Sequence, residues 1–569
     1  MMVVVAGDGS GDYTSLQAAI DAVQGGSRAP DVVLVKAGIY RERVVVNKSN
    51  LRIVGEDRDT TVLTYSACAK DPDENGEERG TFLSFTLIVT GDQVEVENLT
   101  IRNDAGDGRQ VGQAVAVYAA GDRGIWRNCR MIAHQDTLFC GPTMPKVEDF
   151  IAPRGGVSEC VPSVGDSPLT RGRQYFEKCW IAGDVDFIFG PYRCWFEECT
   201  LWMNVRGGWY TAANTPREQP YGMVFHRCSL TGECEEGAAK LGRPWRKYAR
   251  TLFLACDMDA CVSPQGFEDW NEERKITDRC GEYGTMGVRA DQTPRHPKQK
   301  RMTDAENSAV NIPEVLGGYD QWRPDRPAVT WYLCGDSTMA DYGPERYPMM
   351  GWGQKLPGLL EEPVFVQNCA VNGRSSKSFI DEKRLEHIAW CLRPGDKLII
   401  SFSHNDEKAD PLRGTTPDGT FPAYLTRYVE TALTHQAEPI LATPIARRYF
   451  DQQGVLQPTH GAYPAAIRRL AKERGLRLAD LEKGTMDLFR QAGVEGTKEI
   501  FCFLPHGTEN YPEGAADNSH LQEKGAACVA GLFLRLLKEA GKEDRDQTEK
   551  ADSAADLSFL LDQEDSILK

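Results

Sequence analysis

Short runs of β-branched residues, interrupted by Gly, Asn and Asp, fill most of the first half of the chain. This texture is the signal of short strands. The clearest runs are 32–35, 44–46, 51–54 and 87–89. Before them, 14–17 reads Thr-Ser-Leu-Gln, a capping box that leads a short amphipathic helix over 14–23.

A weak repeat follows, in which a polar residue and a small apolar residue come before residues whose side chains point alternately outward and inward. Its members are Asn98-Leu99-Thr100-Ile101, Asn128-Cys129-Arg130-Met131, Lys178-Cys179-Trp180-Ile181, Glu198-Cys199-Thr200-Leu201 and Arg227-Cys228-Ser229-Leu230. Spacings of roughly 20 to 30 residues with one double step suit the coils of a parallel β-helix, where each coil buries its apolar face by stacking. The cysteines then form an interior ladder, and the first helix caps the open end. A β-sandwich is the competing interpretation.

The second half alternates between the two kinds of element. Buried strands are predicted at 329–333, 364–366, 397–401 and 439–442, and helical periodicities recur near 376–391, 422–435, 464–474 and 523–539. This alternation is typical of a parallel sheet covered by helices.

The boundary between the halves is placed at a polar segment that ends in two prolines, Pro324 and Pro327. A chain of 569 residues is expected to hold two or three domains. We predict a first domain over 1–324, a linker over 325–328, a second domain over 329–542 and an acidic tail over 543–569, either disordered or a docked helix. The basic run 296–301 is either a solvated loop or a contact for a polyanionic sugar chain.

Composition limits the partners. With 66 Lys and Arg against 83 Asp and Glu, the net charge is −17, so nucleic acid is not expected to bind. The 17 cysteines are odd in number and lack metal spacing, which favours reduced, buried thiols. The start of the chain resembles no signal peptide and no run is long enough to span a membrane, so we expect a cytoplasmic protein without a membrane partner, unless a signal segment has been removed.

One set of residues on successive coils fits ester hydrolysis by a carboxylate. Such a nucleophile needs a cation to hold it ionised, a second carboxyl that keeps its proton, and amide donors for the oxyanion. The candidates are Gln113, Gln135, Asp136, Asp186 and Arg243.

Around these residues the chain resembles pectin methylesterases, carbohydrate esterase family eight, over about 6–324. The motifs are Gln113-Ala114-Val115-Ala116, Gln135-Asp136-Thr137-Leu138-Phe139, Asp186-Phe187-Ile188-Phe189-Gly190 and Leu241-Gly242-Arg243-Pro244-Trp245, with support from 38–42 and 315–319. The resemblance implies a right-handed parallel β-helix that hydrolyses the C6 methyl ester of galacturonate.

The same resemblance implies a role for each residue. Asp186 is the nucleophile, and Asp136 is the acid that protonates methanol and then the base that activates water. Gln113 and Gln135 form the oxyanion site, and Arg243 fixes Asp186. The aromatic residues expected to line the sugar subsites are Trp245, Phe139 and Phe189. No metal or cofactor is implied.

Two departures from the family pattern lie near Asp136. The segment 140–173 is rich in Pro and Gly and longer than the usual connection, which suggests a restriction to short oligogalacturonides. Ala133-His134 stands where the family has Gly-Phe, so His134 is either a polar packing residue or a substrate contact.

Four blocks of the second half lie at ends of predicted strands or before the last helix, where active groups of such sheets gather. They are Gly335-Asp336-Ser337-Thr338, Asn372-Gly373-Arg374-Ser375, Ser403-His404-Asn405-Asp406 and Asp517-Asn518-Ser519-His520. These blocks resemble the SGNH hydrolases, and among them the rhamnogalacturonan acetylesterases of carbohydrate esterase family twelve, over about 329–540.

In that resemblance Ser337 is the nucleophile, His520 the general base and Asp517 the residue that orients it. The amides of Ser337 and Gly373 and the side chain of Asn405 form the oxyanion hole. Ser403 replaces the usual glycine, which narrows the pocket floor. The remaining histidines of this half are expected to be structural or on the surface: His387, His435, His460 and His506.

The prediction is therefore a multidomain chain, an all-β right-handed parallel β-helix followed by an α/β three-layer, flavodoxin-like SGNH domain. It predicts a bifunctional esterase that removes methyl and acetyl esters from a pectic poly- or oligosaccharide; the oligomeric state is left open. The alternatives are a lyase or glycosidase in the β-helix, one domain that only binds carbohydrate, and a second domain that deacetylates another polysaccharide such as xylan.

Overall fold

The structure is a computed structural model that describes the chain except residues 26–28, 74–75, 155–171, 327, 361–363 and 544–569. The chain divides into two compact units, Met1–Pro327 (unit 1) and Ala328–Lys569 (unit 2). The division falls inside the 325–328 segment. The 543–569 tail of the sequence prediction lies outside the described residues, apart from its first residue.

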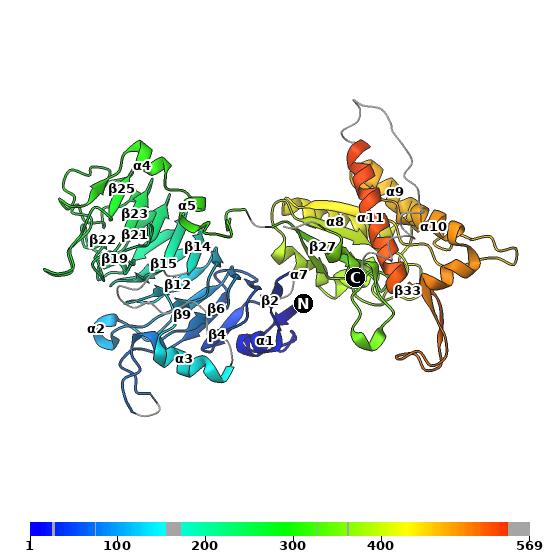
Figure 1. The fold of residues 1–569 in the computed structure, drawn as a ribbon, viewed down its shortest axis with the longest axis horizontal. Helices are drawn as coiled ribbons and strands as arrows, with labels where there is room; N and C mark the ends of the chain where they lie inside the picture. Colours follow the sequence, from blue (N-terminus) through cyan, green and yellow to red (C-terminus); the bar gives the residue numbers. More distant parts are fainter. Residues whose placement is uncertain (26–28, 74–75, 155–171, 327, 361–363, 544–569) are drawn as a thin grey trace. The chain divides into compact units, whose positions relative to one another are not determined.

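Unit 1 is a parallel β-helix (Figure 1). Among its described residues, three parallel sheets of eleven, eight and seven strands run the length of the unit. Between β2 and β24, strands that lie three places apart in chain order pair with each other. Each turn of the chain therefore adds one strand to each sheet, as the repeat predicted. The β-sandwich interpretation is wrong.

The first sheet contains β1 (Met2–Val5), β2 (Asp31–Val35), β5 (Leu51–Gly55), β8 (Val94–Glu97), β11 (Gly124–Arg127), β14 (Arg173–Glu177), β17 (Arg193–Glu197), β20 (Met223–His226), β23 (Thr251–Leu254), β25 (Gly281–Tyr283) and β26 (Lys300–Arg301). The second contains β3 (Gly38–Arg41), β6 (Thr61–Tyr65), β9 (Thr100–Asn103), β12 (Arg130–Ile132), β15 (Trp180–Gly183), β18 (Thr200–Met203), β21 (Ser229–Gly232) and β24 (Asp257–Met258). The third contains β4 (Val44–Val46), β7 (Leu87–Val89), β10 (Val117–Ala119), β13 (Leu138–Cys140), β16 (Ile188–Gly190), β19 (Gly208–Ala213) and β22 (Ala239–Gly242).

The sequence repeat marks the turn from the first sheet to the second. Its polar residue adopts the left-handed conformation at each turn, with φ between 48° and 54° from Asn98 to Arg227. The next residue points inward, and five successive coils place a buried cysteine there: Cys129, Cys179, Cys199, Cys228 and Cys256. Each thiol bonds to a backbone carbonyl oxygen of the preceding coil at 3.3–3.6 Å. The predicted cysteine ladder is confirmed, and all cysteines among the described residues are free.

A second stack of aromatic rings lies beside the cysteines. Phe176, Phe196, Phe225 and Phe253 lie on adjacent strands of the first sheet, with ring centroids 4.4, 4.4 and 4.7 Å apart and nearly parallel planes. The long step between Asn128 and Lys178 is one coil rather than two, because β12 pairs directly with β15.

Short helices close and decorate the β-helix: α1 (Leu16–Ala22), α2 (Gly108–Val111), α3 (Pro145–Ile151), α4 (Asp304–Ser308) and α5 (Ile312–Leu316), with η1 (Thr81–Leu83) and η2 (Ala152–Arg154). Helix α1 packs on the first coils and buries Leu16, Ala19 and Ile20. Its N-cap is Ser15, so the predicted capping box from Thr14 to Gln17 is wrong. Glu42 instead accepts hydrogen bonds from the backbone amides of Leu16 and Gln17.

Unit 2 contains a five-stranded parallel sheet among its described residues, in the order β28-β27-β29-β30-β31. This is the flavodoxin-like order 2-1-3-4-5. The strands are β27 (Thr330–Gly335), β28 (Phe365–Asn368), β29 (Lys397–Ser401), β30 (Glu438–Ala442) and β31 (Arg477–Ala479), and β32 (Phe501–Leu504) pairs antiparallel with β33 (Ala515–Leu521).

Helices cover both faces of this sheet: α6 (Ser376–Asp381), α7 (Arg384–Cys391), α8 (Thr420–Thr434), α9 (Tyr463–Arg474), α10 (Leu481–Gly496) and α11 (Glu523–Glu543), with η3 (Pro344–Arg346), η4 (Trp352–Gly358) and η5 (Thr497–Glu499). Leu333 of β27 packs in one core with Phe533 of α11. The adjacent Tyr332 donates to the carbonyl oxygen of Cys391 in α7. The three-layer α/β prediction is confirmed.

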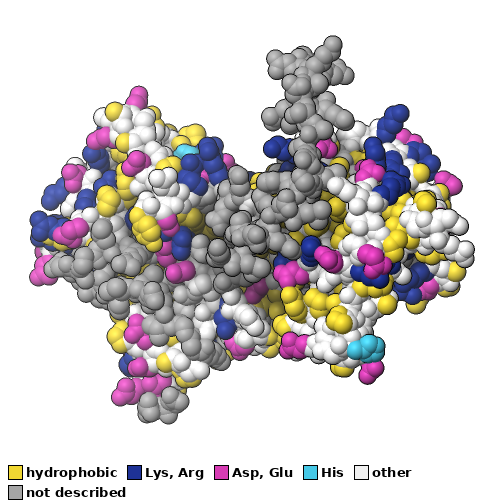
Figure 2. All heavy atoms as spheres, turned by 45° about the vertical axis from the view of Figure 1, so that its right-hand side comes forward, with side chains coloured by type: hydrophobic (Ala, Val, Ile, Leu, Met, Phe, Trp, Pro, Cys, Tyr) yellow, Lys and Arg dark blue, Asp and Glu magenta, His cyan; other side chains and the backbone are white. Residues whose placement is uncertain are grey.

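No helix in the described parts of the chain has the length and hydrophobicity to cross a membrane. On the face drawn in Figure 2, acidic and basic side chains are interspersed rather than gathered by sign.

Candidate active sites

Asp136 and Asp186 stand two residues before β13 and β16, which are neighbours in the third sheet. The pairs Leu138↔Ile188 and Phe139↔Phe189 place the two aspartates at the same level of adjacent coils. Both adopt a left-handed conformation, with φ of 65° and 52°. Aspartate adopts the left-handed conformation more readily than most residues do. The conformation is still strained, and strain of this kind is common at functional sites.

Arg243 follows β22 and forms a bidentate ion pair with Asp186. Its Nε and Nη2 atoms donate to the two carboxylate oxygens at 2.8 and 2.7 Å. The guanidinium carbon lies 3.7 Å from the ring centroid of Trp209 and 4.0 Å from that of Trp270. Two indole rings therefore hold the cation in place beside the carboxylate.

The two carboxyl groups are electrostatically different. Burial raises the pKa of Asp186, and the bonds from Arg243 oppose that rise. Burial also raises the pKa of Asp136, well above its usual range, and the charge of Asp186 raises it further. Asp186 therefore loses its proton first, and the surroundings of Asp136 favour its protonated form.

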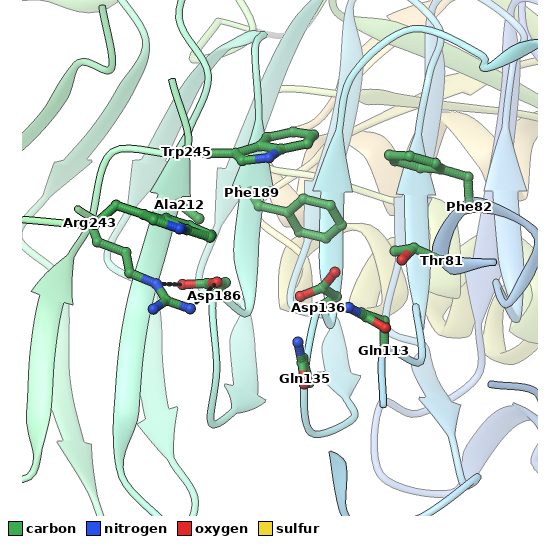
Figure 3. A pocket seen from close by; sticks show the side chains of 11 residues that line it. Thr81, Phe82, Gln113, Gln135, Asp136, Asp186, Phe189, Ala212, Arg243 and Trp245 are labelled. Carbon is green, nitrogen blue, oxygen red and sulfur yellow. Dashed lines mark hydrogen bonds and ion pairs between the residues drawn. The ribbon is translucent and has the colours of Figure 1, made fainter. Parts of the chain in front are cut away.

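The two aspartates open into a pocket of about 280 Å³. Its lining consists of Thr81, Phe82, Gln113, Gln135, Asp136, Asp186, Phe189, Ala212, Arg243, Trp245 and Trp270. Figure 3 shows Asp136 between Asp186 and Gln113, with Gln135 below Asp136 in this view, on the same turn. The five polar residues that the sequence singled out thus meet in one pocket.

The predicted aromatic residues divide into two groups. Phe189 and Trp245 line the pocket. Phe139 is 2% exposed and lies behind it, with its ring centroid 4.8 Å from that of Phe189 and 4.9 Å from that of Phe82. Sequence reasoning did not find Thr81, Phe82, Trp209 or Trp270, because no local motif distinguishes them.

His134 does not line this pocket. Its Nδ1 atom lies 3.2 Å from the carboxylate of Asp184, and both residues line a separate groove on unit 1. Of the 140–173 segment, α3 packs its Val147 and Ile151 in a cluster with Phe139 and Phe189. Residues 155–171, on which the oligosaccharide-length hypothesis partly depends, lie outside the described residues.

In unit 2 three side chains form a Ser-His-Asp triad. His520 Nε2 lies 2.9 Å from Ser337 Oγ, and its Nδ1 lies 2.7 Å from Asp517 Oδ2. Burial opposes ionisation of Asp517, but bonds from the side chain and backbone of His520 lower its pKa to about 2. The carboxylate therefore stays ionised and fixes the orientation of the imidazole. Asp517 and His520 belong to β33, which directly precedes the last helix, α11, as the sequence predicted.

Ser337 follows β27, while Gly373 and Asn405 follow β28 and β29, the strands on either side of it. The backbone amide of Val371 donates to the carbonyl oxygen of Gly335, which joins the loop of Gly373 to the serine turn. Gly373 has φ of 76°, a conformation that favours glycine. Asn405 is 3% exposed and donates from Nδ2 to the carbonyl oxygen of Arg374. All three oxyanion candidates therefore lie at one edge of the sheet.

The residues around Asn405 are braced from inside. The Asp406 carboxylate accepts from the amide and hydroxyl of Ser376, next to the Gly373 loop. Ser403 is fully buried, and its hydroxyl donates to Glu407 at 2.6 Å. His460 is buried between Glu407 and the carbonyl oxygen of Ile445, which fits the structural role expected for it.

Each unit of the chain is similar to known proteins. The pectinesterase family profile matches residues 2–143 and 169–311. The chain belongs to the pectinesterase family. Over 312 residues it is 32% identical to pectinesterase 31 of Arabidopsis thaliana, which covers 54% of this chain and 89% of that protein. The GDSL-like lipase/acylhydrolase family matches residues 333–528.

The acylhydrolase unit is 43% identical over 211 residues to the rhamnogalacturonan acetylesterase RhgT of Bacillus subtilis (strain 168), which covers 37% of this chain and 90% of that protein. Among solved structures, the pectinesterase unit is similar to pectin methylesterase from carrot, with 27% identity, a TM-score of 0.46 and coverage of 56% of this chain and 93% of that one. The chain is a carboxylic ester hydrolase that joins a pectinesterase to an acetylesterase-like unit.

Proposed function

We propose that the pectinesterase unit hydrolyses galacturonate methyl esters and that the acylhydrolase unit removes acetyl esters from the same pectic poly- or oligosaccharide. The observation that carries this proposal is that each unit holds its own complete catalytic set. One is the Asp136, Asp186 and Arg243 group, and the other is the Ser337, His520 and Asp517 triad.

In the first unit, the Asp186 carboxylate attacks the C6 carbonyl carbon of the methyl ester. The side-chain amides of Gln113 and Gln135 donate to the oxyanion that forms. Asp136 gives its proton to the methoxy oxygen, and methanol leaves an acyl anhydride on Asp186. The Asp136 carboxylate then takes a proton from water, whose oxygen attacks the same carbonyl carbon. Galacturonic acid leaves and gives its proton to the solvent, Asp186 is a carboxylate again and Asp136 is protonated.

In the second unit, Ser337 Oγ attacks the acetyl carbonyl carbon while His520 Nε2 takes the hydroxyl proton. Asp517 stabilises the imidazolium. His520 then protonates the departing sugar hydroxyl, which leaves an acetyl ester on Ser337. Water enters, gives a proton to His520 and attacks the acetyl group. Acetic acid leaves as the proton returns from His520 to Ser337, and it then ionises to acetate in the solvent.

The test is incubation of the full chain with pectic oligosaccharides that carry both methyl and acetyl esters, with methanol and acetate measured separately. Asp186→Ala should abolish methanol release and leave acetate release intact, and Ser337→Ala should do the reverse. Loss of both products in either variant would show one shared site and contradict the proposal. New reducing ends or unsaturated sugar products would instead support a glycosidase or lyase.

A further inference from the structure

Unit 1 carries a second groove, of about 570 Å³, on the outer face of its second sheet. It shares no lining residue with the catalytic pocket. It lies where the second-sheet strands β9, β12, β15 and β18 lead into the turns that follow them. The residues that characterise it are Arg102, His134, Trp180, Asp184, Trp202 and Arg206.

Two tryptophans form the floor of this groove. Trp180 and Trp202 lie on the paired strands β15 and β18, with ring centroids 5.7 Å apart and planes inclined by 34°. Their chain neighbours Ile181 and Leu201 point inward and fill the core, so the tryptophans belong to the outer face. Both rings are partly exposed. Ligand sites are typically concave and lined by aromatic side chains with a few polar groups, as this groove is.

Trp180 is also held in position. The guanidinium of Arg130, on the adjacent strand β12, lies 4.7 Å from its ring centroid. A fixed indole ring loses little conformational freedom when a ligand packs on it. The C–H faces of pyranose rings are ligands that suit such a platform.

The charged residues of the groove leave two arginines available. Three of its four acids have a basic partner: Asp107 pairs with Arg109, Asp184 with His134 at 3.2 Å and Asp104 with Arg41 at 3.7 Å. Arg102 and Arg206 have no ion pair among the described residues, and Glu233 is the remaining acid. The groove thus combines an aromatic floor with two cationic side chains that suit carboxylates.

The groove and the catalytic pocket use the same two turns. His134 faces the groove, while Gln135 and Asp136 line the pocket. Asp184 faces the groove, while Asp186 lines the pocket. The bond from Asp184 raises the pKa of His134, which favours the protonated imidazole as the partner of this carboxylate on the groove side of the turn. A chain that occupies the groove is therefore held close to the site of ester cleavage.

We propose that this groove is a second, non-catalytic binding site for a de-esterified galacturonan segment. Such a segment presents ring faces to Trp180 and Trp202 and carboxylates to Arg102 and Arg206. It is the acidic product of the first unit, so the proposal rests on the proposed function. Retention of demethylated chain beside the pocket raises the effective concentration of the esters that remain on it.

The test is calorimetric titration of the full chain with de-esterified octagalacturonate. We expect the Trp180→Ala/Trp202→Ala double variant and the Arg206→Glu variant each to weaken binding at the groove by about tenfold or more. Arg206 is exposed on a turn, so reversal of its charge does not disturb the core. This variant therefore tests the groove even if the double variant misfolds. Two variants serve as comparisons: Trp245→Ala in the catalytic pocket, and Lys472→Glu, an equal charge reversal at an exposed site of α9, outside both cavities.

Loss of binding in Trp245→Ala with none in the groove variants would overturn the inference, because the catalytic pocket would be the only site. An equal loss in Arg206→Glu and Lys472→Glu would also overturn it, because overall charge would then explain binding. Absence of binding to the unsubstituted chain would do the same. Methanol release is measured separately: galacturonan binding without methanol release would refute the proposed function and leave the groove standing.

Discussion

Arg243 binds both carboxylate oxygens of Asp186 and leaves Asp136, at the same level of the preceding coil, without an arginine partner among the described residues. The two carboxyl groups are chemically identical in isolation. Their different surroundings assign one to be ionised and the other to hold a proton.

The first prediction concerns this arginine. Arg243→Gln removes the interaction that opposes the burial-driven rise in the pKa of Asp186, so that pKa rises further. The nucleophile is then protonated over a wider range, and the acidic limb of methanol release should move to higher pH, with kcat/KM at neutral pH lower by about 100-fold or more. The measurement is the pH profile of methanol release. Arg274→Gln is the control, because Arg274 packs on Trp270 but has no contact with Asp186; an unmoved acidic limb in Arg243→Gln would contradict the assignment.

The variant Asp136→Asn tests whether Asp136 donates the proton to the leaving methoxy group. Without it, methoxide must leave unprotonated, so methanol release should fall by about 10²- to 10⁴-fold. A trifluoroethyl ester has a leaving group that needs far less protonation, and its hydrolysis should fall much less. Comparison of the two esters with the same variant is the measurement. An equal loss on both would mean that Asp136 is not the acid.

The triad of the second unit gives a third prediction. Asp517 has a pKa of about 2, so it is ionised at any working pH and adds no limb of its own to the pH profile. Asp517→Asn should lower acetate release by about 10⁴-fold, as loss of the orienting carboxylate does in such triads. Methanol release from the same sample is the internal control. A loss of acetate release below tenfold would show that Asp517 does not orient His520.

Asp406 links stability to pH. Its burial raises its pKa to about 7, from 3.8. A raised pKa in the folded state means that the protonated form stabilises the fold at low pH, and that this contribution, on the order of 4 kcal/mol, is lost as pH rises from about 4 to about 7. Asp406→Asn should flatten this dependence, measured as the temperature at which acetate release is lost. Asp418→Asn, at an exposed site, should keep the slope; a retained slope in Asp406→Asn would assign the pH dependence to another group.

The aromatic stack of unit 1 should dominate local stability. Phe225→Ala leaves a cavity between Phe196 and Phe253 and should cost about 3–5 kcal/mol of unfolding free energy. Denaturant unfolding followed by loss of methanol release measures it. Tyr319→Ala, at a side chain 93% exposed, should cost almost nothing. Equal costs would mean that the stack does not carry the stability of these coils.

Much of this architecture could be read from the sequence because it depends on local rules. A left-handed turn residue followed by an inward cysteine repeats in the sequence as it repeats in space. The buried strands of unit 2 have long apolar runs, and Ser337, Gly373 and Asn405 follow three of them. The two catalytic sets were therefore within reach of motif reasoning.

The missed elements have weak local signals. Strand β31 is three residues long and only Ala479 is buried, while α10 is interrupted by Gly493 with φ of 69°. Trp209 and Trp270 are far apart in sequence and meet only through the fold around Arg243. Phe139 and His134 sit in or beside the catalytic motifs, but the pleat of the strand and the twist of the turn direct them elsewhere.

The pairing of β13 with β16 also has an evolutionary meaning. Strand spacing in a sheet is about 4.8 Å whatever the length of the loops between strands. The distance between the two catalytic aspartates is thus determined by backbone hydrogen bonds between the strands and not by the intervening sequence. Insertions in that sequence can alter substrate choice while the reaction geometry stays fixed. New specificities can therefore evolve without a change in the distance between the two catalytic aspartates.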